Sequence, residues 1–204
     1  MIAVRGGVGT GMTTDRGDGT VDGTVDGTAR EAGHGGGGGS GGVVVDVDDV
    51  TFTTLDGRAT TLGDLGGTVR LVANVASRCG YTPQYAALER LWQAYRDRGL
   101  VVVGFPTNQF LQELGSEEAI AEFCQVNYGV TFPMSAKVKV NGRGRHALFT
   151  RLTEVPDDDG KAGRVAWNFE KWLVLPGGEA RRFRSKVEPD APEVVRLIEG
   201  ALAG

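Results

Sequence analysis

The sequence predicts an α/β protein in which helices flank a central mixed β-sheet. Two apolar runs, residues 69–76 and 100–105, lack the polar alternation of a surface strand, which is typical of buried central strands. A helix is predicted between them, and the short connections favour a parallel crossover. Near the carboxyl end, Pro176-Gly177-Gly178 separates two further strand-like runs, which predicts a hairpin and makes the sheet mixed.

The 204 residues divide into an amino-terminal extension, residues 1–42, and one predicted domain, residues 43–204. The extension holds 16 of the 33 glycines and none of the prolines, tryptophans or cysteines. Because it has little apolar surface to bury, it is predicted to be a flexible, disordered tail. The remaining residues are numerous enough to bury a core without disulfides or a bound metal.

The composition excludes several classes of protein. The chain has two cysteines and two histidines, His34 and His146, which lie far apart, so we expect neither a metal site nor a bound cofactor. A net charge of −4 argues against nucleic-acid binding. The apolar runs are far shorter than the ~20 residues of a membrane span, and the first residues lack the apolar block of a secretory signal. We therefore expect a cytoplasmic protein with reduced thiols.

The first predicted element is a half-buried strand over residues 43–54, in which apolar and polar residues alternate. An Asp-Gly turn at residues 55–58 joins it to a short strand over residues 58–62, so we expect an amino-terminal β-hairpin. A single helical turn, opened by Thr61 or Gly63, precedes the first buried strand.

The helix between the two buried strands is predicted to begin at Thr82-Pro83. Thr82 suits the N-cap, and Pro83 suits the first helical position, where a missing N–H is no loss. Arginines and Gly99 are expected to end this helix. Apolar side chains at helical spacing form its predicted buried face: Leu88, Leu91, Trp92 and Tyr95.

The carboxyl-terminal half is predicted to continue the alternation of helices and strands. Ser116 suits the N-cap of a helix that runs to about Tyr128 and stops at Gly129. The remaining predicted elements are a strand within residues 130–140, a short helix over 145–153, hairpin strands over 169–175 and 179–184, and a closing amphipathic helix over 190–203.

Cys79 is the candidate reactive residue. It lies directly after a buried strand and just before a helix N-terminus, where sites form in open α/β sheets. The N–H groups and partial positive charge of such a terminus stabilise a nucleophilic thiolate. Alternatively, Cys79 is a small buried apolar residue. Because residues 79–82 lack the second cysteine of Cys-x-x-Cys, Cys79 suits attack on a substrate better than disulfide exchange.

Five motifs occur in order along the predicted domain: NVASRCGYTPQY at 74–85, GFPTNQF at 104–110, NYGVTFPM at 127–134, VKVNG at 138–142 and WNFEKWLV at 167–174. Together they resemble the glutathione peroxidase family over roughly residues 44–203. The resemblance implies a thioredoxin-like fold. It also implies an antioxidant enzyme that uses a thiol to reduce hydrogen peroxide and organic or lipid hydroperoxides.

The resemblance further implies a catalytic group of four side chains. Cys79 corresponds to the peroxidatic cysteine, and Trp167 and Asn168 correspond to the family's Trp-Asn pair. Gln112 corresponds to the catalytic glutamine, although its loop is one residue shorter than in the family and lacks the proline; Gln109 competes for this role. Amide and indole N–H groups are neutral donors that can stabilise negative charge on the departing oxygen.

A thiol must reduce the sulfenic acid that peroxide leaves on Cys79. Cys124 could act as a resolving cysteine through an internal disulfide that thioredoxin later reduces. The resemblance, however, places the family's resolving cysteine one position along, at Gln125. Alternatively, glutathione or another small external thiol reduces Cys79 directly, and Cys124 is structural.

Two other functions compete with a peroxidase. A peroxide sensor or redox-relay protein would use the same Cys79 chemistry but pass the oxidation to a partner protein. An inactive binding domain would require an unreactive Cys79, which the intact Trp-Asn pair disfavours. His146 is interpreted as structural. The short loop over residues 154–165 favours a monomer whose site is open to bulky hydroperoxides.

Overall fold

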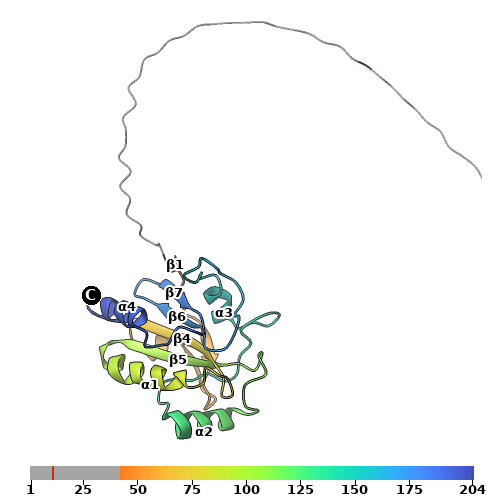
Figure 1. Cartoon of the computed structure of the whole chain (residues 1–204), viewed down its shortest axis with the longest axis vertical. Coiled ribbons are helices and arrows are strands. Elements are labelled where there is room, and N and C mark those ends of the chain that lie inside the picture. Colours follow the sequence, from red (N-terminus) through yellow and green to blue (C-terminus); the bar gives the residue numbers. More distant parts are fainter. Residues whose placement is uncertain (1–10, 12–41) are drawn as a thin grey trace, which may run out of the picture. The chain divides into compact units, whose positions relative to one another are not determined.

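The computed structural model describes Gly11 and residues 42–204 (Figure 1). The predicted tail, residues 1–42, lies almost entirely outside the described residues, so its flexibility stays a prediction. The described domain contains a five-stranded sheet, a separate two-stranded hairpin and helices, in the α/β arrangement that the sequence predicts.

The five-stranded sheet has the order β1-β7-β6-β4-β5. Only β4 and β5 are parallel, and the other neighbouring strands are antiparallel, so the predicted mixed sheet is confirmed. Its strands are β1 (Val43–Val44), β4 (Val69–Val75), β5 (Leu100–Pro106), β6 (Lys171–Val174) and β7 (Glu179–Phe183). Every residue of β4 and β5 is buried, as expected of central strands that are covered on both faces.

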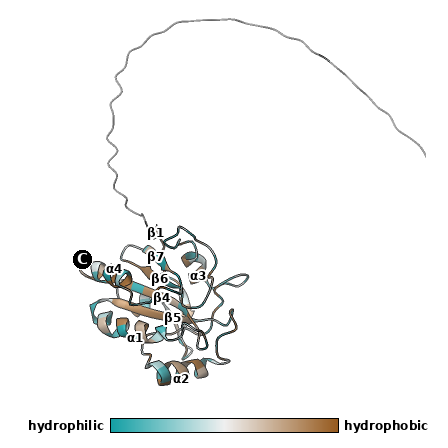
Figure 2. Cartoon of the chain, viewed as in Figure 1, coloured by the Kyte–Doolittle hydropathy of each residue, from teal (hydrophilic) through white to brown (hydrophobic). Residues whose placement is uncertain are grey.

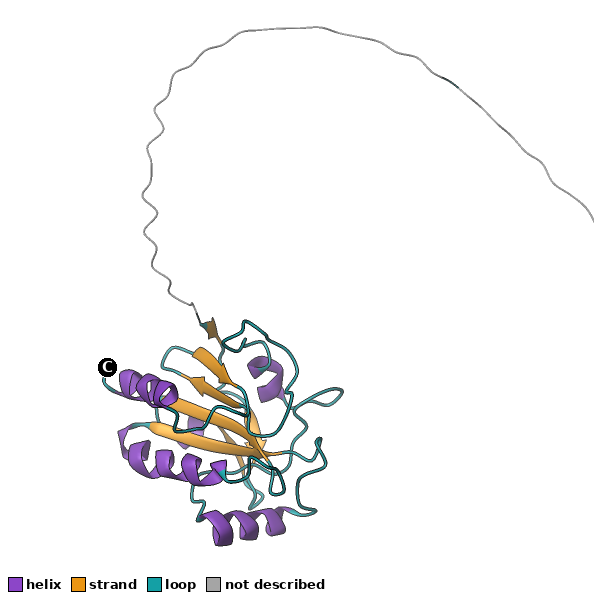
Figure 3. Ribbon diagram, in the orientation of Figure 1, coloured by secondary structure: helices purple, strands orange, loops and turns teal. Residues whose placement is uncertain are grey.

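The sheet separates two apolar clusters, since alternate side chains of a strand point to opposite faces. Leu71 and Ala73 of β4 belong to the first cluster, and Val72 belongs to the second. Helices α1 (Gln84–Tyr95) and α4 (Pro192–Leu202) cover the first cluster, and α3 (Ala147–Leu152) together with the non-helical segment over residues 45–52 covers the second (Figure 3). The most apolar strands therefore have both faces covered (Figure 2).

The strand predicted over residues 43–54 is wrong, because the chain forms two short strands in different sheets. β1 pairs with β7, whereas β2 (Thr51–Thr53) pairs with β3 (Ala59–Thr61) in the expected hairpin. Between them, the carbonyl of Asp48 accepts the N–H of Gly63 at 3.0 Å, and its carboxylate pairs with Arg70 at 2.7 Å. These tertiary contacts interrupt the alternating pattern.

The predicted role of Thr82 as N-cap is also wrong. α1 begins at Gln84 with Pro83 as its N-cap residue. The hydroxyl of Thr82 instead accepts the backbone N–H of Cys79 at 2.9 Å and donates to the carbonyl of Ala76 at 2.8 Å. Thr82 therefore stabilises the loop that contains Cys79 and not the helix that follows.

No strand forms within residues 130–140, contrary to the prediction. Val138 donates one hydrogen bond of 2.9 Å to the end of β5. The side-chain carbonyl of Gln109 then accepts the backbone N–H groups of Val140 and Asn141, at 2.6 and 2.8 Å. A glutamine side chain thus takes the hydrogen bonds that a neighbouring strand would provide.

The second long helix, α2 (Glu117–Tyr128), agrees with the sequence at both ends. Ser116 is the N-cap, and its hydroxyl accepts the N–H of Ala119 at 3.2 Å. Gly129 ends the helix in the left-handed region, at a φ of 61°. Within the described part of the chain, no helix has the length and apolar character needed to cross a bilayer.

Candidate active site

Three segments that carry predicted site residues meet at one edge of the five-stranded sheet. Val75 at the end of β4 pairs with Pro106 at the end of β5, so the loops to Cys79 and Gln112 leave from the same edge. β6 runs antiparallel to β4, and the residues before Lys171 therefore lie at this edge too. The fold itself thus gathers residues that are up to 89 positions apart in the sequence.

The Cys79 loop holds its sulfur close to a backbone donor. Cys79 is buried, with 7% of its surface exposed, and the N–H of Tyr81 lies 3.4 Å from Sγ. The next residue, Gly80, is exposed, and a Cβ added there would meet no atom within 4 Å. The sulfur therefore combines a hydrogen-bond donor with open space beside its loop.

The structure brings Gln112 and Asn168 into direct contact, since Asn168 Nδ2 donates to Gln112 Oε1 at 3.1 Å. The carbonyl of Gln112 also accepts the backbone N–H of Arg78 at 2.9 Å, next to Cys79. The shorter loop therefore still reaches the site. The competing glutamine, Gln109, faces another segment, where Nε2 donates to the carbonyl of Asn141 at 3.0 Å.

Asn168 and Trp167 have contrasting surroundings. Asn168 is fully buried, and its Oδ1 has no hydrogen-bond partner among the described residues. Trp167 keeps 39% of its surface exposed, and its ring lies 5.2 Å from the ring of Phe110. Its carbonyl accepts Nδ2 of Asn74 at 3.0 Å, which attaches the pair to the end of β4.

Glu170, which was not among the residues predicted from the sequence, holds the peptide that precedes this pair. Its buried Oε1 accepts the N–H groups of Ala166 at 2.6 Å and Trp167 at 3.4 Å. Its Oε2 accepts Arg182 Nε and Nη2 at 2.9 and 2.7 Å, and Arg184 Nη1 at 2.9 Å. The signal in the sequence is the acidic residue inside WNFEKW opposite alternating arginines in RRFR.

Glu113 is a second carboxylate that sequence reasoning missed. Its Oε1 accepts the backbone N–H groups of Ser77 at 3.1 Å and Leu114 at 2.8 Å, which joins the loops of Cys79 and Gln112. Burial raises the pKa of Glu113, although these hydrogen bonds oppose the increase. Two glutamates thus tie together the loops around the site.

Known proteins are similar to this chain in sequence and in fold. The model of the glutathione peroxidase family matches residues 47–153. The chain belongs to the glutathione peroxidase family. It is therefore an oxidoreductase that reduces hydroperoxides with a thiol, as the resemblance implied.

Two curated relatives and one solved structure illustrate the match. The thioredoxin/glutathione peroxidase BtuE of Escherichia coli K12 is 44% identical, over 73% of this chain and 93% of the relative. The hydroperoxy fatty acid reductase gpx1 of Synechocystis sp. PCC 6803 is 43% identical, over 71% and 90%. The crystal structure of T. cruzi GPX1 is 28% identical, with a TM-score of 0.61 over 78% and 97%. The thioredoxin-like fold is thereby confirmed.

The second cysteine of the chain, Cys124, lies on the core-facing side of α2. Only 2% of its surface is exposed, whereas Gln125 beside it is exposed. Burial, reinforced by the charge of Glu113, raises the pKa of the Cys124 thiol to about 11. Cys79 and Cys124 contribute to the same apolar cluster, and both are free thiols.

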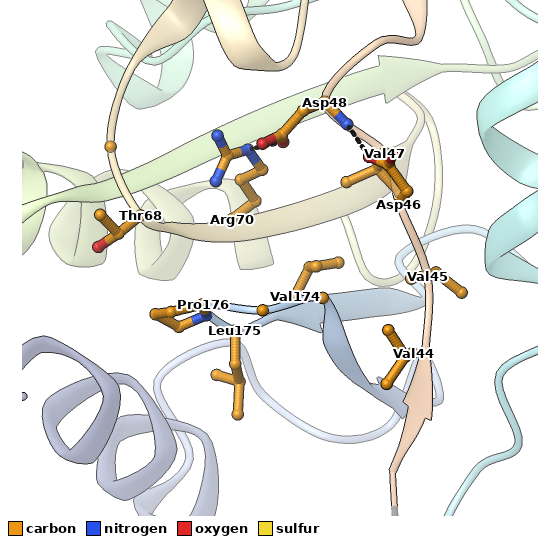
Figure 4. A pocket seen from close by; sticks show the side chains of 13 residues that line it. Val44, Val45, Asp46, Val47, Asp48, Thr68, Arg70, Val174, Leu175 and Pro176 are labelled. Atoms are coloured by element: carbon orange, nitrogen blue, oxygen red, sulfur yellow. Dashed lines mark hydrogen bonds and ion pairs between the residues drawn. The ribbon is translucent and has the colours of Figure 1, made fainter.

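Two other features lie outside the catalytic group that the resemblance implies. His146, interpreted as structural, is the N-cap of α3, where Nδ1 accepts the N–H of Leu148 at 3.3 Å. A pocket of about 540 Å³ surrounds Arg70 near the opposite end of β4, where this residue pairs with Asp48 (Figure 4). None of the predicted site residues lines that pocket.

Proposed function

We propose that Cys79 is the peroxidatic residue of this peroxidase and that Gln112, Trp167 and Asn168 supply the hydrogen bonds that assist it. The observation that carries the proposal is the hydrogen-bonded chain from Asn168 through Gln112 to the peptide of Arg78, beside Cys79. This chain connects the segments before β6, after β5 and after β4. It gives the polar groups a fixed arrangement before a substrate arrives, which favours electrostatic stabilisation of a transition state.

In the proposed reaction, the thiolate of Cys79 attacks the terminal oxygen of a hydroperoxide. A sulfur electron pair forms the S–O bond, and the O–O bond breaks with its electron pair on the departing oxygen. That oxygen takes a proton and leaves as an alcohol, or as water when the substrate is hydrogen peroxide. Cys79 is left as a sulfenic acid. The amide and indole donors stabilise the negative charge that develops on the departing oxygen.

We further propose that an external thiol, from thioredoxin or glutathione, restores Cys79 and that no metal or organic cofactor takes part. Two thiols reduce the sulfenic acid, releasing water and leaving the two thiols as a disulfide. The names of the relatives support this range of reductants, because BtuE is a thioredoxin/glutathione peroxidase. Burial and a pKa of about 11 disfavour Cys124 as the attacking thiol in this conformation.

The test measures hydroperoxide consumption by the full chain with thioredoxin plus its reductase and, separately, with glutathione. Wild type, Cys79→Ser and Cys124→Ser are compared. We expect sustained turnover in wild type and Cys124→Ser and none in Cys79→Ser. Loss of thioredoxin-supported turnover in Cys124→Ser would instead show that Cys124 resolves Cys79 through a disulfide. Consumption of about one peroxide per wild-type chain would favour the sensor or relay function.

A further inference from the structure

Leu111 occupies an unusual position immediately before Gln112. Its φ of 58° lies in the left-handed region, which side chains other than glycine and asparagine rarely adopt. Its side chain is 88% exposed, so the core does not compensate for this conformation. Strained residues of this kind concentrate at binding and catalytic sites, because such a site retains them in spite of their cost to stability.

Leu111 lies beside apolar residues and beside residues of the candidate active site. Four large apolar residues are exposed in the described part of the chain, and Leu111 and Trp167 are two of them. Phe110, directly before Leu111, packs against the Trp167 ring. We call Phe110, Leu111 and Trp167 the apolar rim. Gln112, directly after Leu111, is uncharged, and its side chain accepts a hydrogen bond from Asn168.

We propose that Leu111 is a specificity-determining residue that favours hydroperoxides with an apolar chain or ring over hydrogen peroxide. This inference rests on the proposed role of Cys79. The apolar rim would contact the organic part of the substrate while its peroxide group reaches the sulfur. Covering an exposed leucine with apolar substrate removes both surfaces from water, a gain that hydrogen peroxide cannot provide. The rim includes the proposed donor Trp167 and directly precedes the proposed donor Gln112 in the sequence, which argues for substrate as its occupant.

The experiment isolates the oxidation of Cys79 from its later reduction. Fully reduced chain is mixed with hydrogen peroxide or cumene hydroperoxide without any reductant, and quenched samples are alkylated to measure the remaining Cys79 thiol by mass spectrometry. The quantity of interest is the ratio of the two second-order rate constants. Leu111→Gly and Leu111→Asn remove the apolar group while suiting the left-handed backbone, and Leu111→Met keeps an apolar group. Val126→Thr changes an exposed apolar residue on α2 as the control.

We expect the ratio for cumene hydroperoxide over hydrogen peroxide to fall about tenfold in Leu111→Gly and Leu111→Asn. Leu111→Met and Val126→Thr should keep it within about twofold. Unfolding temperatures at or above that of wild type in the first two variants would show that the chain still folds. An unchanged ratio in both would overturn the inference.

Two further outcomes would also overturn it. If the ratio is unchanged but thioredoxin-supported turnover falls in Leu111→Gly, the apolar rim binds the reductant protein and not the substrate. If neither peroxide oxidises Cys79 in the wild-type chain, the proposed function itself fails, and the inference fails with it. The first outcome leaves the role of Cys79 intact, so the two failures are distinguishable.

Discussion

The two cysteines of this chain are similarly buried but have different local surroundings. Cys79 and Cys124 are both more than nine-tenths buried, and both contribute to the same apolar cluster. Cys79, however, lies in a loop between exposed residues, with a backbone N–H directed at its sulfur. Cys124 lies within a twelve-residue helix and faces the core. The difference is one of local backbone: the Cys79 loop directs a backbone N–H at the sulfur, whereas the backbone N–H groups around Cys124 belong to its helix.

The largest expected effect is the slowing of alkylation at Cys124 when the chain folds. Burial raises the pKa of Cys124 from 9.0 to about 11, which at pH 8 reduces its thiolate fraction by on the order of 100-fold relative to the unfolded chain. We therefore expect iodoacetamide to modify Cys124 at least about 100-fold more slowly in the folded chain than in denaturant. Mass spectrometry of peptides from timed samples measures both cysteines at once. Rapid modification of folded Cys124 would contradict the comparison and would indicate that α2 opens readily.

The next largest effect should come from the amide and indole groups that are proposed to assist Cys79. Asn168→Ala removes the amide that contacts Gln112, and we expect the rate constant for oxidation of Cys79 by peroxide to fall on the order of 100-fold. Asn127→Ala is the matched control, because Asn127 is an exposed asparagine of α2 that donates to the carbonyl of Phe123. A decrease of less than threefold in Asn168→Ala would remove the donor role from the proposed mechanism.

The sequence predicted well the elements that depend on local pattern. β4 and β5 are continuous apolar runs, and α2 has Ser116 and Gly129 at its ends, so neighbouring residues suffice to specify these elements. The strands expected over residues 43–54 and within 130–140 failed for one reason. Distant partners supplied the hydrogen bonds there, namely the backbone N–H of Gly63 at Asp48 and the side chain of Gln109 at residues 140 and 141, and a local pattern contains no information about such partners.

The candidate site likewise contains residues that a local motif predicts and residues that it does not. Cys79 and the pair Trp167 and Asn168 belong to contiguous motifs, and the sequence was enough to single them out. Glu113 and Glu170 act on backbone N–H groups of other loops, so their positions become informative only when the sheet edge has brought those loops together. For Glu170 the signal that could have identified it is an acidic residue opposite the arginines of RRFR.

Alkaline pH should lower the free energy of unfolding because of the raised pKa of Cys124. The folded chain keeps the Cys124 thiol protonated up to about pH 11, whereas the unfolded chain releases the proton near pH 9. The stability that burial of the neutral thiol contributes is therefore complete below pH 9 and is lost as the pH rises through 11. We expect wild type to lose about 2 kcal/mol more than Cys124→Ala between pH 8 and 11. Urea unfolding at a series of pH values measures this, and parallel curves would contradict the raised pKa.

The smallest expected effect is on the rate of Cys79 oxidation when Glu170, which holds the peptide before Trp167, is changed. Glu170→Gln keeps an oxygen for the N–H groups of Ala166 and Trp167 but removes the negative charge that Arg182 and Arg184 share. Because the arginines then hold residue 170 less firmly, the peptide before Trp167 is positioned less well, and we expect Cys79 oxidation to slow about tenfold at a temperature where the chain stays folded.

A matched carboxylate separates this positioning effect from a general loss of charge. Glu179→Gln removes the partly exposed partner of Arg181 on β7 and should leave the oxidation rate within about twofold of wild type. Alkylation of Cys124 gives a second readout, since α2 makes no hydrogen bond to Glu170 among the described residues. If Glu170→Gln slows Cys79 oxidation and leaves Cys124 protected, the glutamate acts on the loop side alone. If it exposes Cys124 as well, the ion pairs of Glu170 with Arg182 and Arg184 stabilise the whole domain. The Cys79 loop and α2 would then depend on the same contacts.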